Sequence, residues 1–268
     1  MLFSCSEKKI VNGLIDEKSI QTEILNHEFQ SILDSVGIKG SILIYDLQNE
    51  VYFSNDFEWA KKGRLPASTF KIANSLIALE TEVVEDDQTI FKWNGEERAL
   101  DSWEQDLNLR DAFHFSCVPC YQEVARKIGL RRMIEYLNRF NYGSIDVNET
   151  TIDTFWLVGD SRINQVQQID FLRKFYQSEL AITERTEKIM THIMVMEENK
   201  DYKLSGKTGW SIQNGINNGW FVGYIETKNK VYFFATNVEP KADFIMDLFP
   251  IIRKEVTLMA LKKIEVIN

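Results

Sequence analysis

Residues 219–238, GWFVGYIETKNKVYFFATNV, decide the fold class, because they contain two consecutive β-strand patterns. Aromatic and β-branched residues dominate both 219–227 and 230–238, and such residues are typical of strands. The polar Lys228-Asn229-Lys230 between them suits a tight turn. We therefore predict an antiparallel hairpin close to the C-terminus.

Other strands and helices are predicted on either side of this hairpin. Residues 202–209, YKLSGKTG, predict a strand before it, and 40–46 with 51–53 predict a hairpin near the N-terminus. Helical apolar spacing occurs in the middle of the chain, over 68–80, 105–115, 118–128, 130–139 and 167–178. A last helical segment starts at Asp243, and its Pro250 predicts a break or a first helical turn.

Strands at both chain ends predict one antiparallel sheet that is built from both termini and flanked by helices. The mainly helical middle would then form an inserted lobe. This is an α/β fold of the α+β kind, with residues 1–20 as an N-terminal tail and 21–268 as one two-lobed domain. A cleft between the lobes is the natural place for a site.

Composition excludes several functions. The chain has 268 residues, of which 44% are hydrophobic, so it can bury a sizeable core. Its net charge of −9 and the absence of a Lys/Arg block argue against nucleic acid or an anionic membrane as a partner. No apolar run reaches the roughly 18 residues of a transmembrane helix.

The N-terminus carries a separate signal. Leu2-Phe3-Ser4-Cys5 resembles the end of a bacterial lipoprotein signal, in which the cysteine becomes lipidated. The chain would then begin within its own signal, and Cys5 would be a lipid anchor in a periplasmic or cell-envelope protein. The alternative is an ordinary N-terminus.

Residues 66–71, PASTFK, place Ser68 and Lys71 three positions apart at the start of an apolar helix. On a helix these side chains share a face. A serine hydroxyl needs a base to become a nucleophile, and a lysine becomes one only when burial disfavours its charged form. By itself, the pair is more readily explained as a helix cap followed by a solvated lysine.

Two further motifs would line the same cleft. Ser116 precedes Pro119 and could either cap a helix or relay a proton into the cleft. Lys207-Thr208-Gly209-Trp210 lies on a predicted strand, where a lysine and a hydroxyl beside a glycine suit a substrate carboxylate. The alternative is an ordinary edge strand with a solvated lysine.

In order and spacing, these three motifs resemble those of the penicillin-recognising serine enzymes: S-x-x-K, then S-x-V about 50 residues on, then K-T-G about 90 further. Ser116-Cys117-Val118 is similar to the motif of the class D, oxacillinase-type β-lactamases rather than to the class A S-D-N. FNYGS (140–144) and FWLVG (155–159) also resemble class D segments. The resemblance runs from about residue 26 to 264.

This resemblance implies a mechanism. Lys71 would react with CO₂ to form a carbamate that is the general base for Ser68, and no other cofactor and no metal would be needed. Trp156 would donate its indole N–H to the carbamate, and Val118 and Leu157 would cover it. Ser116 would relay a proton toward the leaving β-lactam nitrogen, and Lys207 would add positive charge nearby.

The resemblance also implies how a small β-lactam substrate is bound. Thr208 and Arg253 would hold its carboxylate, and the backbone N–H groups of Ser68 and Trp210 would form the oxyanion hole beside Gly209. Trp103 would shape the substrate site. Two departures from the family pattern, Ser144 in the Y-G-N box and Val158 after Leu157, leave loop packing open.

His114, Cys117 and Cys120 form an H-x-x-C-x-x-C pattern. It offers three metal ligands where structural zinc usually takes four, and it lacks the context of a redox dithiol. We expect small buried cysteines that pack a helix.

Three alternatives to the hydrolase remain open. A β-lactam sensor domain would be acylated without turnover, a D,D-transpeptidase would act on peptidoglycan, and a metal or redox module would use the cysteines. The oligomeric state, monomer or homodimer, is not determined by the sequence.

Overall fold

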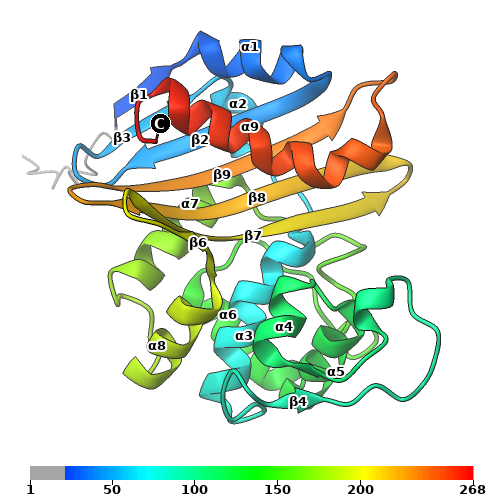
Figure 1. Ribbon diagram of the computed structural model, residues 1–268. Coiled ribbons are helices and arrows are strands. Elements are labelled where there is room, and N and C mark those ends of the chain that lie inside the picture. The colour runs from blue at the N-terminus through cyan, green and yellow to red at the C-terminus, as the bar shows by residue number, and fades with distance from the viewer. Residues whose placement is uncertain (1–21, 268) are drawn as a thin grey trace, which may run out of the picture.

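A seven-stranded sheet in the order β1-β3-β2-β9-β8-β7-β6 organises the computed structural model, which describes residues 22–267 (Figure 1). Its strands are β1 (Thr22–Leu25), β2 (Ile38–Asp46), β3 (Val51–Ser54), β6 (Val195–Glu198), β7 (Tyr202–Gln213), β8 (Ile216–Thr227) and β9 (Val231–Pro240). All pairs are antiparallel except β1 with β3. N-terminal β2 pairs directly with C-terminal β9, which confirms the prediction of a sheet built from both termini.

Helices lie on both faces of this sheet, and most of the remainder form a separate lobe beside β7 (Figure 1). They are α1 (His27–Ser35), α2 (Phe57–Lys61), η1 (Ala67–Phe70), α3 (Lys71–Glu80), η2 (Asp101–Trp103), α4 (Leu109–His114), α5 (Val118–Ile128), α6 (Leu130–Phe140), α7 (Gln165–Tyr176), α8 (Glu184–Ile193), η3 (Met246–Leu248) and α9 (Phe249–Lys263). The small strands β4 (Ile90–Phe91) and β5 (Leu107–Asn108) pair within the lobe.

Strand β8 explains why both faces of the sheet must be covered. Trp220, Val222 and Tyr224 belong to the hydrophobic cluster shared with the helical lobe, whereas Phe221 and Ile225 belong to the cluster under α1 and α9. Successive side chains of a strand point to opposite faces. A strand that is apolar at nearly every position therefore requires a layer on each side.

The predicted hairpins and most helices are confirmed, with shifted ends. β7 and β8 extend to Gln213 and Ile216, and Pro250 lies in the first turn of α9, where its missing N–H costs nothing. The prediction of a helix over 105–115 is wrong at its start, because Leu107 and Asn108 pair with β4 before α4 begins. Predictions for Cys5 and the tail lie outside the described residues.

Candidate active site

The turn that carries Ser68 lies against strand β7. Gly209 makes this approach possible, since a Cβ at that position would lie 3.1 Å from Thr69 Cγ2 and 3.3 Å from Ala67 Cβ. Ala67 itself has a left-handed backbone with φ of 52°, and its N–H donates to the Trp156 carbonyl over 2.8 Å. Non-glycine residues in this conformation are concentrated at functional sites, where the surrounding structure holds them.

Ser68 and Lys71 meet as predicted, with Lys71 Nζ donating to Ser68 Oγ at 3.0 Å. The Lys71 side chain is fully buried, and burial lowers its pKa from 10.5 to about 7. In residues 22–267 no carboxylate forms an ion pair with it, and its ammonium lies 5.0 Å from the centre of the Tyr121 ring. The solvated lysine of the alternative interpretation is therefore excluded.

Trp156 is completely buried and stacks on Phe70, with ring centres 5.2 Å apart. Within residues 22–267 its indole N–H has no hydrogen-bond partner. Buried donors are normally paired, and an unpaired one costs free energy. Phe70 directly precedes Lys71, so the Trp156 ring packs against the turn that carries Lys71.

Ser116 and Lys207 also meet. Lys207 Nζ donates to Ser116 Oγ and to the Thr208 carbonyl, the latter over 3.2 Å. Burial, then the charges of Lys71 and Arg253, hold the pKa of Lys207 well below its usual value. Ser116 has a left-handed backbone, with φ of 55°. The two motifs, 91 residues apart in sequence, therefore form one polar contact beside the Ser68 turn.

Arg253 reaches the same strand from α9. Its guanidinium donates to the Gly209 carbonyl and lies 5.9 Å from the centre of the Trp210 ring. Burial lowers its pKa to about 10, so it stays cationic at neutral pH. The Trp210 indole is fixed in turn by Asn217 Oδ1 at 2.9 Å.

Trp103 lies in η2, beside the segment that leads to Ser116. Only 9% of it is exposed, and its indole N–H donates to the Phe115 carbonyl at 2.9 Å. It therefore supports the segment that leads to Ser116. Val118 and Leu157 are half-buried and pack against the core cluster that contains Trp156.

The two departures from the family pattern lie on loops. Ser144 is held by its backbone, which exchanges hydrogen bonds of 2.8 and 2.7 Å with Arg162. Val158 is 49% exposed, and the neighbouring Gly159 N–H donates to Gln213 Oε1 over 2.8 Å. Both positions are therefore held through backbone hydrogen bonds of the loop.

The two cysteines of the C-x-x-C spacing are bonded to each other. Cys117 and Cys120 are buried as predicted, but they form a disulfide, with their Cα atoms 5.4 Å apart. Their positions just before and within the first turn of α5 bring them within bonding range. In residues 22–267 no group of three or more His, Cys, Asp and Glu could hold a metal ion.

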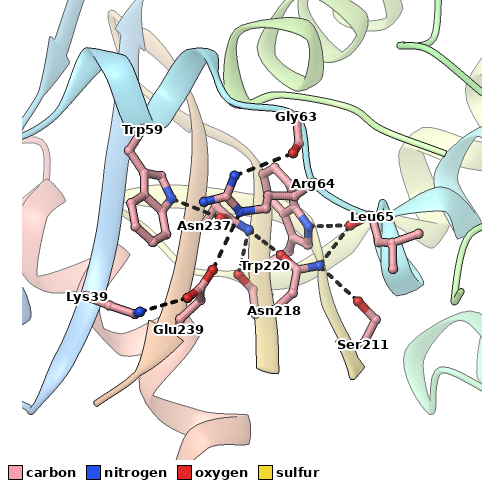
Figure 2. A network of polar contacts seen from close by, with 11 residues as sticks. Lys39, Trp59, Gly63, Arg64, Leu65, Ser211, Asn218, Trp220, Asn237 and Glu239 are labelled. Carbon is pink, nitrogen blue, oxygen red and sulfur yellow. Dashed lines mark hydrogen bonds and ion pairs between the residues drawn. The ribbon is translucent and has the colours of Figure 1, made fainter. Parts of the chain in front are cut away.

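A polar network behind the Ser68 turn was not predicted (Figure 2). The Leu65 carbonyl, three residues before Ser68, accepts from the Trp220 indole at 2.8 Å and from Asn218 Nδ2 at 2.9 Å. Asn218 Nδ2 also donates to Ser211 Oγ at 3.0 Å. These hydrogen bonds thus connect the chain segment before Ser68 to strands β7 and β8.

A second layer orients Asn218. Asn237 Nδ2 donates to Asn218 Oδ1 at 2.8 Å, and the Trp59 indole donates to Asn237 Oδ1 at 3.0 Å (Figure 2). Each amide therefore has a fixed orientation, because one of its atoms donates and the other accepts.

Comparison with known proteins identifies the class. Residues 40–247 match the family described as "Penicillin binding protein transpeptidase domain", so the chain belongs to that class of folds. "Beta-lactamase OXA-48" of Klebsiella pneumoniae is 41% identical over 218 residues, which are 81% of this chain and 82% of that protein. The solved "class D beta-lactamase from Sebaldella termitidis ATCC 33386" is 40% identical, covers 92% of this chain and 100% of its own, and gives a TM-score of 0.87.

Within that class, the chain belongs to the class D β-lactamases, and it is a hydrolase of that family. A more distant relative, the "Regulatory protein BlaR1" of Bacillus licheniformis, is 28% identical over 219 residues. These are 81% of this chain but only 36% of that protein.

Proposed function

We propose that this protein hydrolyses the β-lactam ring of penicillins and related antibiotics, with a carboxylated Lys71 as general base. The observation that carries the proposal is a buried lysine with no carboxylate partner in residues 22–267, hydrogen-bonded to Ser68. At a pKa of about 7, half of the amine is neutral at neutral pH, and only the neutral amine attacks CO₂.

The surroundings of Lys71 fit a carbamate. The unpaired Trp156 indole N–H is a donor for which the described protein supplies no acceptor. Val118 and Leu157 limit the entry of water. When present, the carbamate supplies a carboxylate that accepts the proton of Ser68 and later that of the hydrolytic water.

In acylation, Ser68 Oγ attacks the β-lactam carbonyl, and the Ser68 and Trp210 N–H groups stabilise the oxyanion. Losing one such donor typically costs about 3–4 kcal/mol of barrier. Ser116 donates its proton to the leaving nitrogen, and Lys207 replaces it through their hydrogen bond. Thr208 and Arg253 hold the substrate carboxylate, with Arg253 positioned by its bond to Gly209.

The alternative is a β-lactam sensor that stays acylated, and its basis is the similarity to the regulatory protein BlaR1. Both functions need Ser68 and Lys71. They differ in deacylation, so turnover separates them.

For the chain as a whole, we propose a domain over residues 21–268 in the periplasm or cell envelope, with Cys5 as a lipid anchor if it is modified. No helix of residues 22–267 is long and apolar enough to cross a membrane. Monomer and homodimer both stay open.

The test is hydrolysis of a chromogenic β-lactam by the purified protein. We expect steady turnover, a loss of roughly a thousand-fold or more for Ser68→Ala, and unchanged turnover for Ser31→Ala, a change on the distant α1. A single stoichiometric burst would favour the sensor, and no acylation at all would contradict both.

The base is tested with CO₂. Because Lys71 has a pKa of about 7, its amine is mainly protonated at pH 6 and mainly neutral at pH 8. Activity of degassed enzyme should decline at pH 6 and return at pH 8 with bicarbonate. A rate that changes neither when CO₂ is removed nor when bicarbonate is added would contradict a carboxylated lysine.

A further inference from the structure

The Cys117–Cys120 disulfide lies within the motif that contributes Ser116, and neither the proposed mechanism nor the family resemblance gives it a role. Cys117 is the residue that precedes α5, and Cys120 is the third residue of that helix. The Cys120 N–H also donates to Cys117 Sγ over 3.2 Å. In most helices these two positions are linked by side-chain hydrogen bonds alone. Here a covalent bond closes the first turn.

Backbone hydrogen bonds connect Ser116 to this closed turn. The Cys117 N–H donates to the Ala112 carbonyl at 2.9 Å, and the Ser116 N–H donates to the Phe113 carbonyl at 3.1 Å. Ser116 is therefore held between the end of α4 and the closed first turn of α5. It has little freedom to leave its left-handed conformation, which an unconstrained serine rarely adopts.

The hydroxyl position depends on that conformation. Ser116 Oγ accepts from the buried Lys207 Nζ, so a rotation about the Ser116 backbone would separate the two groups. Proton transfer requires hydrogen-bond contact, and a misplacement of about 1 Å can cost as much as a hundred-fold in rate.

We propose that the Cys117–Cys120 disulfide is a positioning device for Ser116, and that catalysis by this protein is therefore sensitive to reduction. The inference rests on the proposed function, since it acts on the proton relay of that reaction. Reduction by dithiothreitol breaks the S–S bond and forms two S–H bonds, and dithiothreitol is oxidised to its cyclic disulfide. Two electrons and two protons thus pass to the cysteine pair.

The disulfide is buried, since Cys117 is 0% and Cys120 is 3% exposed. Its state is therefore verified before any rate is compared. Reduced and denatured protein should show two more reactive thiols than denatured native protein, those of Cys117 and Cys120. An equal number of thiols before and after reduction would contradict the proposal directly.

The kinetic test compares native enzyme, reduced enzyme and Cys117→Ala/Cys120→Ala, well below their melting temperatures. We expect kcat/KM for a chromogenic β-lactam to fall roughly ten-fold on reduction and in the double variant. Reoxidation should restore the reduced enzyme. The variant Cys117→Ser/Cys120→Ala keeps a side-chain acceptor at the helix cap. Its decrease in kcat/KM therefore measures the effect of losing the covalent bond while the cap hydrogen bond is kept.

A cycle with Ser116→Ala separates positioning from general stability. If the disulfide acts through Ser116, losing it in the Ser116→Ala background should change kcat/KM by less than about two-fold. A ten-fold loss in both backgrounds, or native kcat/KM in verified reduced enzyme, would overturn the proposal. Absence of any turnover by native enzyme would instead contradict the proposed function.

Discussion

Lys71 shows how one buried residue can be unfavourable for stability and still required for chemistry. An ammonium without a carboxylate partner costs several kcal/mol in a protein core. Burial lowers the pKa of Lys71 to about 7. The cost is reduced because the neutral amine is available at physiological pH. The indole of Trp156 carries a second cost, because its buried N–H donor has no partner in the part of the chain that the structure describes. A carboxylate group attached to Lys71 would relieve both of these costs.

Replacing Trp156 with phenylalanine tests whether its indole N–H supports the base. In Trp156→Phe the ring remains and the N–H donor is lost, so a carbamate on Lys71 should be less stable. Deacylation should slow more than acylation, by roughly ten-fold or more. Mass spectrometry of the protein during turnover should therefore detect a longer-lived acyl-enzyme.

A second substitution, at the residue before Trp156, provides the control. Phe155→Leu alters a neighbouring buried ring without removing a donor, so it should affect stability more than the ratio of the two rates. No accumulation of acyl-enzyme in Trp156→Phe would show that the indole does not support the base.

Between elements, two side chains of β8 hold the chain segment that precedes Ser68. Asn218 and Trp220 both donate to the Leu65 carbonyl, which lies within the buried interface of the two lobes. An unsatisfied buried carbonyl costs about 1–3 kcal/mol. With two donors, the loss of one leaves the carbonyl paired.

We therefore expect Trp220→Phe and Asn218→Ala each to destabilise the protein by about 1–2 kcal/mol, and the double variant to lose more than the sum. Urea unfolding measures these differences, and Asn94→Ala in an exposed loop is the control. Strict additivity would show that the two donors do not share the carbonyl.

Elements differ in how well the sequence predicts them. The hairpins were predictable because β8 and β9 combine apolar strand residues with a polar turn. α8 was missed because few of its ten residues are buried, among them Met190 and Ile193. β4 and β5 were missed because two residues each carry no periodicity.

The same limit applies to the site. Ser68 with Lys71, and Ser116 with Lys207, could be grouped from motif spacing and family resemblance. The position of Trp103 depends on the short η2 turn, which no sequence pattern indicates. The C-x-x-C spacing of Cys117 and Cys120 is compatible with a metal, free thiols or a disulfide, and only the backbone geometry of α5 selects one.

For the whole molecule, the two buried lysines predict how stability depends on pH. An unfolded lysine has a pKa of about 10.4, whereas that of Lys71 is about 7 and that of Lys207 is lowered too. Between pH 7 and 9 the unfolded chain therefore binds more protons than the folded protein. The free energy of unfolding should rise with pH, by about 2 kcal/mol from Lys71 alone.

Urea unfolding at pH 7 and pH 9 in CO₂-free buffer tests this. Lys71→Met should be more stable than the native protein at pH 7 and should lose the Lys71 part of the increase. A native stability that is equal at both pH values would contradict the lowered pKa of both lysines.

The pairing of β2 with β9 has a consequence for how the chain reaches this structure. Ile38 lies opposite Pro240, so the centre of the sheet joins segments roughly two hundred residues apart, a highly non-local contact that makes folding slow. A ribosome releases residue 240 long after residue 38, and until then β2 lacks its main partner. The sheet is therefore completed only after residue 240 has left the ribosome, and until then the emerging chain stays accessible to chaperones that bind unfolded polypeptides.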